Sequence, residues 1–164
     1  MLRRLPVWGY ECDDKAIDFE WPTQEIFDLQ QPDVTLKSLE FCGDKDLIAS
    51  VKCNLSNGQS SPVFCKVGGK YSESNPKTIE FDSTPIRTVS AADEQDHDFE
   101  DGNMHRIKFL DGVGNQVFIY ENGYTGQETE HQIRENEELI GVYGVKNKNL
   151  FFTSFGFILK VKRQ

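Results

Sequence analysis

One short hydrophobic pattern recurs three times along this chain, each time with the alternation that is typical of a β-strand. Its copies occupy residues 47–53, 103–109 and 152–158. When Val51, Ile107 and Phe155 are aligned, the intervals between them are 56 and 48 residues. A second strand-like pattern at residues 85–90 is echoed at residues 138–143. Repetition at this spacing predicts an architecture of repeated supersecondary units, with Val51, Ile107 and Phe155 in equivalent, inward-facing positions.

From Val34 onward almost the whole chain follows a β pattern, with turn signals between the segments. Strands are expected around residues 36–41, 47–55, 62–64, 78–81, 86–89, 106–110, 116–120, 138–143 and 155–161. The Asn57-Gly58 pair predicts a tight hairpin with a two-residue turn, in which Cys53 would pair with Pro62. About ten to twelve short strands of this kind are typical of an all-β sandwich, barrel or prism.

Residues 1–33 differ from the rest of the chain. They mix acidic residues, prolines and aromatic residues without a clear period, and their only helical signal is the short stretch 23–27. We therefore divide the chain into an N-terminal extension of uncertain structure, residues 1–33, and a β domain, residues 34–164.

Acidic residues outnumber basic ones by 27 to 18, which gives the 164-residue chain a formal charge of −9. A nucleic-acid-binding protein needs a concentrated positive face, and the sequence contains no such cluster. Lys160, Lys162 and Arg163 alternate with apolar residues, so we expect them to face solvent from a strand edge. No apolar run approaches the roughly 20 residues of a membrane helix, and the N-terminus lacks the apolar stretch of a secretory signal. We expect no nucleic-acid partner, no membrane insertion and a cytoplasmic location.

Two segments near the C-terminus carry a resemblance to a known family. Leu139–Gly144 and, after a loop, Ser154–Leu159 are similar to the last two strands of the jacalin-related lectins. Gly68-Gly69 falls where that family has a glycine-rich loop, and residues 8–14 are weakly similar to its N-terminal motif. The resemblance covers residues 34–163. It implies a β-prism of three four-stranded Greek-key sheets with pseudo-threefold symmetry.

The resemblance also implies where a ligand would bind. The family binds sugar through a Gly-x-x-x-Asp loop before its last strand, whose carboxylate accepts charge-assisted hydrogen bonds from two sugar hydroxyls. Here the equivalent residues run from Asn149 to Thr153, and the related positions in the other repeats are Ala49 and His105. Because a single hydroxyl does not chelate a diol as a carboxylate does, the resemblance implies a degenerate sugar site. The candidate ligand-binding residues are Gly68, Gly69, Lys70, Asp96, Asp98, Lys148, Asn149, Leu150, Phe151 and Thr153.

A second candidate feature is the acidic segment from Asp93 to Asp101, which holds six carboxylates in nine residues. Acids at alternate positions from Asp96 to Glu100 resemble an EF-hand loop, but Gly102 falls one place late and the Glu at the twelfth position is missing. Two interpretations stay open. The segment is either a solvated acidic loop or a loop that contacts calcium or sugar.

The sequence offers little that could support catalysis. His97, His105 and His131 are dispersed, and no Gly-x-Ser-x-Gly nucleophile turn is present. The Gly112–Gly114 stretch lies between two expected strands and precedes no helix, which indicates a hairpin loop rather than a dinucleotide site. We expect no enzyme activity, no cofactor and no metal site.

Two non-enzymatic functions remain. The first is a protein-interaction or structural module that retains the prism with a degenerate sugar site, and the second is an active carbohydrate-binding lectin. The missing acid and the pair Leu150-Phe151, which is expected to be exposed, favour the first, whereas Phe152 is expected to be a buried cap. In either case the partner, a protein or a glycan, would bind where the loops around 68–70, 96–102 and 147–153 converge.

All four cysteines are predicted to be free thiols. Cys12, Cys42, Cys53 and Cys65 show no Cys-x-x-Cys spacing, and in the expected hairpin Cys53 does not face Cys65. Titration of the denatured, unreduced protein with a thiol reagent should therefore find four thiols. A count of two or fewer would show that a disulfide has formed.

Overall fold

The computed structural model of this chain describes residues 1–9, 17–29, 33–43, 48–64, 74–82, 84–96, 101–121, 128–146 and 152–162. These residues form antiparallel strands and one short helix. The elements are β1 (Leu2–Arg4), β2 (Trp8–Gly9), β3 (Phe19–Trp21), α1 (Gln24–Asp28), β4 (Leu36–Gly43), β5 (Ile48–Leu55), β6 (Ser74–Glu80), β7 (Thr88–Asp96), β8 (Asp101–Leu110), β9 (Gln116–Glu121), β10 (Glu128–Gln132), β11 (Glu137–Lys146) and β12 (Phe152–Val161).

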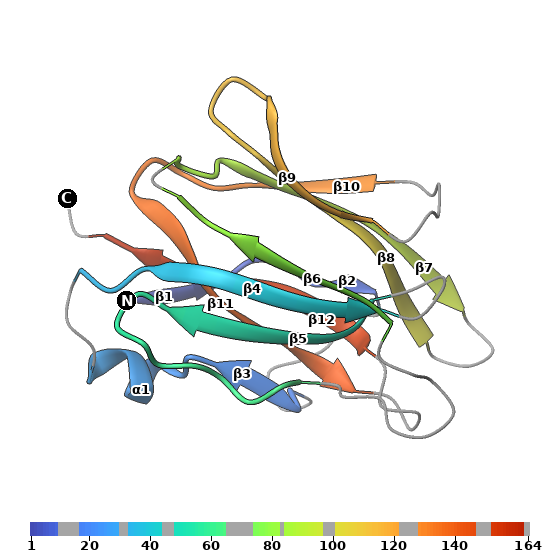
Figure 1. The fold of residues 1–164 in the computed structure, drawn as a ribbon, viewed down its shortest axis with the longest axis horizontal. Helices are drawn as coiled ribbons and strands as arrows, with labels where there is room; N and C mark the ends of the chain where they lie inside the picture. The colour runs from blue at the N-terminus through green and yellow to red at the C-terminus, as the bar shows by residue number, and fades with distance from the viewer. Residues whose placement is uncertain are drawn as a thin grey trace.

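The strands are arranged in three sheets around one interior (Figure 1). The first sheet has the order β1-β12-β11-β3, with β2 also paired to β12. The second has the order β10-β7-β8-β9, and the third has the order β5-β4-β6. All pairings are antiparallel. Three such sheets form a β-prism, which confirms the fold class expected from the sequence.

Each sheet has Greek-key connectivity. In the second sheet β7, β8 and β9 are consecutive neighbours, and β10 returns to lie beside β7. In the third sheet Ser60 and Phe64 form bridges to β5, while β6 pairs with β4 on the opposite side. In the first sheet the β11–β12 hairpin lies between N-terminal strands, with β1 and β2 beside β12 and β3 beside β11. The described N-terminal residues are therefore part of the first sheet.

The interior contains the residues that the recurring pattern predicted. Val51 of β5, Ile107 of β8 and Phe155 of β12 are 0 %, 0 % and 1 % exposed. Each lies in a different sheet and faces the common interior. The prediction that these three residues occupy equivalent, inward-facing positions is confirmed.

Aromatic side chains join the sheets across the interior. Phe109 of β8 contacts Phe157 of β12 with ring centroids 5.7 Å apart, and Phe41 of β4 contacts Tyr120 of β9 at 5.1 Å. Phe157 also contacts Phe155 on its own strand at 5.2 Å. None of these five rings is more than 1 % exposed. Edge-to-face and offset pairs of this kind contribute about 0.5–1.5 kcal/mol each beyond the burial of their surface.

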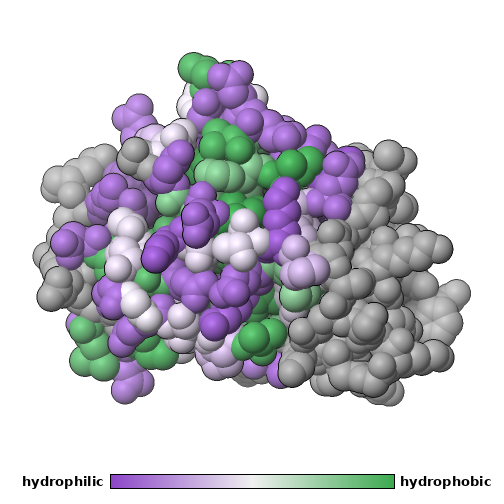
Figure 2. Space-filling model, viewed as in Figure 1, coloured by the Kyte–Doolittle hydropathy of each residue, from purple (hydrophilic) through white to green (hydrophobic). Residues whose placement is uncertain are grey.

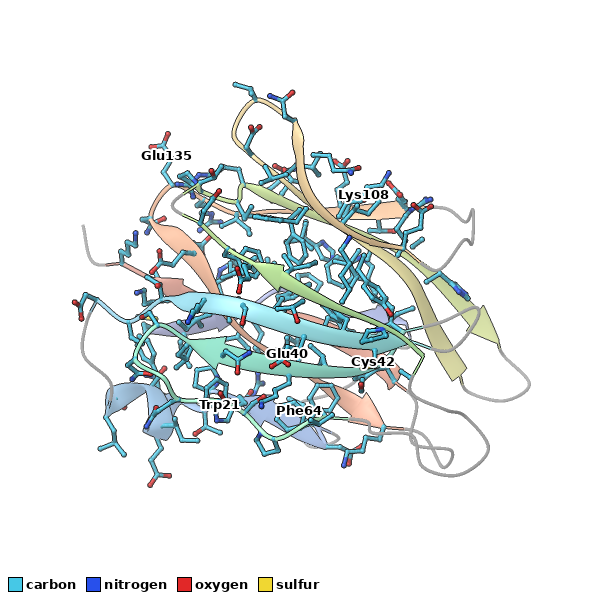
Figure 3. All side chains as sticks on the ribbon, in the orientation of Figure 1. Trp21, Glu40, Cys42, Phe64, Lys108 and Glu135 are labelled. Carbon is cyan, nitrogen blue, oxygen red and sulfur yellow. The ribbon has the colours of Figure 1, made fainter. Side chains whose placement is uncertain are left out.

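Two glycines of β11 let the neighbouring strands approach this strand closely. A Cβ atom at Gly141 would lie 2.0 Å from the carbonyl oxygen of Trp21. One at Gly144 would lie 2.2 Å from the carbonyl oxygen of Ser154 and 2.8 Å from the ring of Phe19. Trp21, labelled in Figure 3, and Phe19 belong to the neighbouring strand β3, whereas Ser154 belongs to β12 on the other side of β11. A larger residue at Gly141 would push β3 away from the sheet, and one at Gly144 would displace both β12 and β3.

The Asn57-Gly58 pair forms the predicted hairpin, with a register one residue different from the expected one. Gly58 has φ of 90°, and the Leu55 amide donates to the Gln59 carbonyl at 2.8 Å, so the loop contains three residues. Three-residue loops of this kind end in a residue with positive φ, which glycine adopts without strain. As a result Cys53 faces Ser61, whose amide donates to the Cys53 carbonyl at 2.9 Å, and not Pro62.

The helical signal at residues 23–27 is confirmed by α1. The Thr23 hydroxyl accepts a hydrogen bond from the Ile26 amide at 3.2 Å, which is the usual contact of an N-cap residue. The helix is five residues long. Among the described residues, no helix has the length and apolar composition needed to cross a membrane.

Two of the four cysteines are described, and both are free thiols. Cys42 lies towards the right-hand end of β4 in Figure 3 and is partly exposed. Cys53 is fully buried, and burial raises the pKa of its thiol because the thiolate would lose its hydration. The prediction of free thiols is confirmed for these two residues. Cys12 and Cys65 lie outside the described residues.

The interior positions allow a direct test of the packing. Replacing Ile107 or Phe155 with Ala should lower the free energy of unfolding by about 2–5 kcal/mol, because each change removes buried side-chain atoms and leaves a cavity. Val113→Ala, at a position that is 82 % exposed, is the control and should change stability by less than about 0.5 kcal/mol. Urea denaturation measures all three. A loss below about 1 kcal/mol in both interior variants would contradict the packing described here.

Candidate functional site

The strands give the prism two different ends. β4, β7 and β11 run in the same direction, towards the right in Figure 1. We call the end where these strands finish, at Gly43, Asp96 and Lys146, the loop end. The opposite end, where the same three strands begin, is called the groove end.

The loop end is where the sequence predicts ligand binding. Eight of the ten candidate residues lie outside the described residues, namely Gly68, Gly69, Lys70, Asp98, Lys148, Asn149, Leu150 and Phe151. For Asp96 and Thr153 the structure describes the backbone but not the side chain. Asp96 lies opposite Asp101, and Thr153 is the second residue of β12. The set of ten residues stays a prediction.

The described residues that flank the three predicted segments lie at the same end of the prism. The flanking pairs are Phe64 and Ser74, Asp96 and Asp101, and Lys146 and Phe152. Five of the six lie where β6, β7, β8, β11 or β12 starts or finishes at the loop end (Figure 1), and Phe64 forms a bridge to Val51 of β5. The three segments therefore leave and rejoin the prism at one end.

An aromatic cluster closes the interior at the loop end. Phe19 of β3 stacks on Phe64 with ring centroids 4.9 Å apart and contacts Phe152 at 5.5 Å. Phe152 is 1 % exposed, so its expected role as a buried cap is confirmed. The Asp18 carboxylate accepts a hydrogen bond from the Lys146 amide at 2.8 Å and fixes the end of β11 beside β3.

The two residues related to Thr153 by the pseudo-threefold symmetry are buried. Ala49 of β5 is 5 % exposed and His105 of β8 is 3 % exposed. Neither carries an acid, and neither side chain reaches solvent. Neither position can therefore supply the carboxylate that Thr153 lacks.

The groove end contains a cavity of about 640 Å³ that the sequence analysis did not predict. Its floor is apolar and comes from all three sheets, because Leu36 begins β4, Ile86 precedes β7 and Leu139 lies near the start of β11. Phe81, which is partly exposed, adds an aromatic wall. The lining comes from five separate stretches of the chain, so no local sequence signal marks it.

Glu137 supplies a buried charge beside this cavity. Its side chain is 2 % exposed, and its carboxylate accepts hydrogen bonds from the Arg3 guanidinium at 2.6 and 2.9 Å. It also accepts one from the Arg134 amide at 3.0 Å. The bond to Arg3 lowers the pKa of Glu137, although burial alone would raise it, and the same bond raises the pKa of Arg3. The pair holds β1 against the start of β11.

Arg87 holds the start of β7 beside the turn between β10 and β11. Its guanidinium donates to the backbone carbonyls of Arg134 at 2.7 Å, Glu137 at 3.2 Å and Glu135 at 3.5 Å. Figure 3 labels Glu135 at this turn. The guanidinium of Arg87 therefore uses its donors on backbone carbonyls.

Lys160 is a correction to the sequence analysis, which expected it to face solvent. It is 5 % exposed, and its ammonium donates to the Val34 carbonyl at 2.5 Å and pairs with Glu138. Burial is tolerated because the ammonium has both a carbonyl and a carboxylate as partners. Lys162 pairs with the other oxygen of Glu138 at 3.2 Å and remains 54 % exposed.

Asp82 and Lys37 form the polar rim of the cavity. The Asp82 carboxylate accepts a hydrogen bond from the Thr84 amide at 2.8 Å, and this bond lowers the pKa of Asp82. The Phe81 amide donates to the Lys37 carbonyl at 2.8 Å, so the segment that carries Asp82, just after β6, runs beside Lys37 of β4. Within the described part of the chain, neither Asp82 nor Lys37 forms an ion pair.

The described surface is mainly hydrophilic. Figure 2 shows hydrophilic side chains over most of the described part of one face, with small, separate hydrophobic areas. The large hydrophobic side chains that are exposed among the described residues are Met1, Leu29, Val63 and Val113, which come from distant segments. The described part of the face in Figure 2 therefore has no large continuous hydrophobic patch.

Within the described residues, no group of three His, Cys, Asp or Glu side chains lies close enough to hold a metal ion. The side chains of residues 93–101 lie outside that description. Both interpretations of the acidic segment, as a solvated loop and as a calcium or sugar contact, stay predictions.

Comparison of sequences finds no relative. No protein-family model matches the chain, and no curated protein matches it. Solved structures do match nearly all of it. The mannose-binding lectin from champedak superposes with a TM-score of 0.61 at 16 % identity, over 97 % of this chain and 96 % of the lectin. Malaysian banana lectin superposes with a TM-score of 0.62 at 13 % identity, over 99 % of this chain and 100 % of the lectin.

Two longer proteins also match. PirB has a TM-score of 0.69 at 13 % identity, and the lamprey immune protein has a TM-score of 0.60 at 21 % identity. This chain spans less than half of either one, 39 % of PirB and 44 % of the lamprey protein. Together the matches show that the chain has a divergent form of the jacalin-like β-prism fold.

The pairing of Glu137 with Arg3 predicts a specific pH dependence of stability. Because the pKa of Glu137 is lower in the folded protein, its contribution is complete above the unfolded value of about 4.3. The contribution is lost as the pH falls through the folded value. Glu137→Gln should therefore lower the free energy of unfolding at pH 7. When the pH falls below about 4.3, the variant should lose less further unfolding free energy than the native protein does.

Urea denaturation from pH 7 to pH 3 measures this effect. The control Glu130→Gln removes the same charge from an exposed position on β10 and should leave stability at pH 7 unchanged. If native protein and Glu137→Gln lost stability in parallel as the pH falls, the Arg3–Glu137 pair would not be a source of acid sensitivity.

Proposed function

We propose that this chain is a non-enzymatic β-prism module that binds carbohydrate at its loop end. The observation that carries the proposal is the superposition of nearly the whole chain on single-module lectins of matching length. One of them is a mannose-binding lectin, and two further matches are artocarpin in complex with mannotriose and the Calsepa lectin in complex with a biantennary N-glycan.

The geometry of the strands supports the loop end as the binding surface. Three segments leave and rejoin the prism there, on strands fixed by the aromatic cluster of Phe19, Phe64 and Phe152. Segments carried by a rigid sheet can vary in sequence without loss of the fold, and for this reason binding residues are common in them.

The proposed sugar site is degenerate. Thr153 stands where the jacalin-related lectins have an acid, so the strongest hydrogen-bond acceptor of that site is missing. Backbone amides of the 147–153 segment, together with Lys148 and Asn149, would supply the remaining contacts. We infer weaker monosaccharide binding than a carboxylate would give.

A second candidate function is protein interaction through the same end. Two sequence features favour it, the missing acid and the adjacent apolar residues Leu150 and Phe151. Asp96, Asp98 and Lys148 would form a mixed-charge rim around these two residues, as in many protein interfaces.

The described histidines support a non-enzymatic role. His105 is buried within β8, and His131 packs against Trp8 with ring centroids 4.6 Å apart. Burial lowers the pKa of His131. Both side chains contribute to packing, and neither lies beside the cavity at the groove end.

Restoring the acid tests the proposal. The double change Thr153→Asp with Asn149→Gly should strengthen binding of mannose or galactose at least about tenfold, because a carboxylate then accepts hydrogen bonds from two hydroxyls. Isothermal titration calorimetry measures the affinity. Thr129→Asp, which adds the same charge on the exposed strand β10, is the control and should change nothing.

The alternative gives a different result. If the double change leaves sugar binding absent while Phe151→Ala abolishes association with a native protein partner, the loop end is a protein interface. That outcome would overturn the carbohydrate proposal in favour of the second candidate.

A further inference from the structure

The cavity lies at the groove end of the prism, opposite the end where β4, β7 and β11 finish. Its volume of about 640 Å³ falls within the range of roughly 300–1,000 Å³ that is usual for small-molecule sites. The floor is apolar and the rim is polar, which is also the usual composition of such sites. All of its lining residues belong to the described part of the chain.

The charges that line the cavity balance one another. Lys37, Arg87 and Lys162 are matched by Asp82, Glu137 and Glu138. Both glutamates are held by basic side chains, and the Arg87 guanidinium donates to backbone carbonyls. An anionic ligand would therefore meet no group of available cations, and a neutral ligand fits the balance better.

The groups that remain suit a ligand with many hydroxyls. The Asp82 carboxylate is exposed and uses its Oδ1 atom for the Thr84 amide, which leaves further acceptor capacity. Lys37 of β4 carries a further donor, its ammonium. The Ser56 hydroxyl accepts a hydrogen bond from the Thr35 amide at 2.9 Å and keeps its own proton to donate, whereas the Thr84 side chain already bonds to Asp82. The partly exposed ring of Phe81 offers an apolar surface between these polar groups.

We propose that this cavity is a second binding site, for a neutral carbohydrate. The Asp82 carboxylate accepts hydrogen bonds from adjacent sugar hydroxyls, Lys37 donates to a ring or hydroxyl oxygen, and Phe81 packs against the apolar face of the sugar. This inference shares its ligand class with the proposed function, but it depends on different residues at the other end of the prism. A single chain with a site at each end bridges two glycans without forming an oligomer.

An NMR titration of the full-length chain, labelled with ¹⁵N, tests the inference. The probes are methyl mannoside, methyl glucoside, methyl galactoside and, separately, inorganic phosphate. At least one sugar should shift the amide signals of residues 35–37 and 81–87, whereas phosphate should not. Asp82→Asn keeps the acceptor for the Thr84 amide but removes the charge, and should weaken sugar binding at this site at least about tenfold.

A matched control is available in the chain. Asp111 accepts hydrogen bonds from the amides of Val113 and Asn115 at 3.0 and 2.9 Å, in a turn of similar type at the tip of the β8–β9 hairpin. Asp111→Asn removes the same charge from a residue that does not line the cavity. It should leave the sugar-induced shifts at residues 35–37 and 81–87 unchanged.

The possible outcomes separate this inference from the proposed function. Groove-end shifts that disappear in Asp82→Asn support the second site, even if the loop end stays silent. Shifts restricted to residues 144–146 and 152–154 overturn the second site and leave the proposed function intact. Groove-end shifts produced by phosphate alone, or sugar-induced shifts unchanged by Asp82→Asn, also overturn the site as described. Silence at both ends with all three sugars counts against both proposals.

Discussion

The fold depends on aromatic side chains that meet between the three sheets. A sheet with one apolar face has to bury that face against another element, and here each sheet buries it against the other two. Phe109 and Phe157 connect the second sheet to the first, while Phe41 and Tyr120 connect the third to the second. Because these contacts fix the strands without help from the connecting segments, both ends of the prism are free to carry binding residues.

The N-terminal and C-terminal strands complete the first sheet and make the groove end of the prism different from the loop end. β1 pairs with β12 through Leu2 and Lys160, so the first sheet becomes a Greek key only when the N-terminal strands lie beside the C-terminal hairpin. The same pairing brings Arg3 to Glu137 at the groove end. Glu137, Glu138 and Arg87, which line part of the cavity at that end, are held by ion pairs and by hydrogen bonds to backbone carbonyls, a rigid setting for a small ligand.

Much of this architecture could be predicted from local patterns, and the exceptions have physical reasons. Val51 and its counterparts were found because alternation along a strand reports burial directly. The three N-terminal strands were missed because each has only two or three residues and pairs with a strand more than 100 residues away. Lys160 appeared solvent-facing because its partners, Glu138 and the Val34 carbonyl, are distant in sequence. Most of the predicted site lies outside the described residues, and the cavity is formed from segments that only the fold brings together.

Carbohydrate binding is the central claim, and a glycan array probed with the labelled full-length chain tests it most directly. The array is run with and without calcium, because the acidic segment 93–101 could otherwise hide a requirement for the ion. The account predicts saturable binding to at least one glycan class, competed by the corresponding free sugar. Absence of binding across mannose, galactose and glucose classes under both conditions would contradict it.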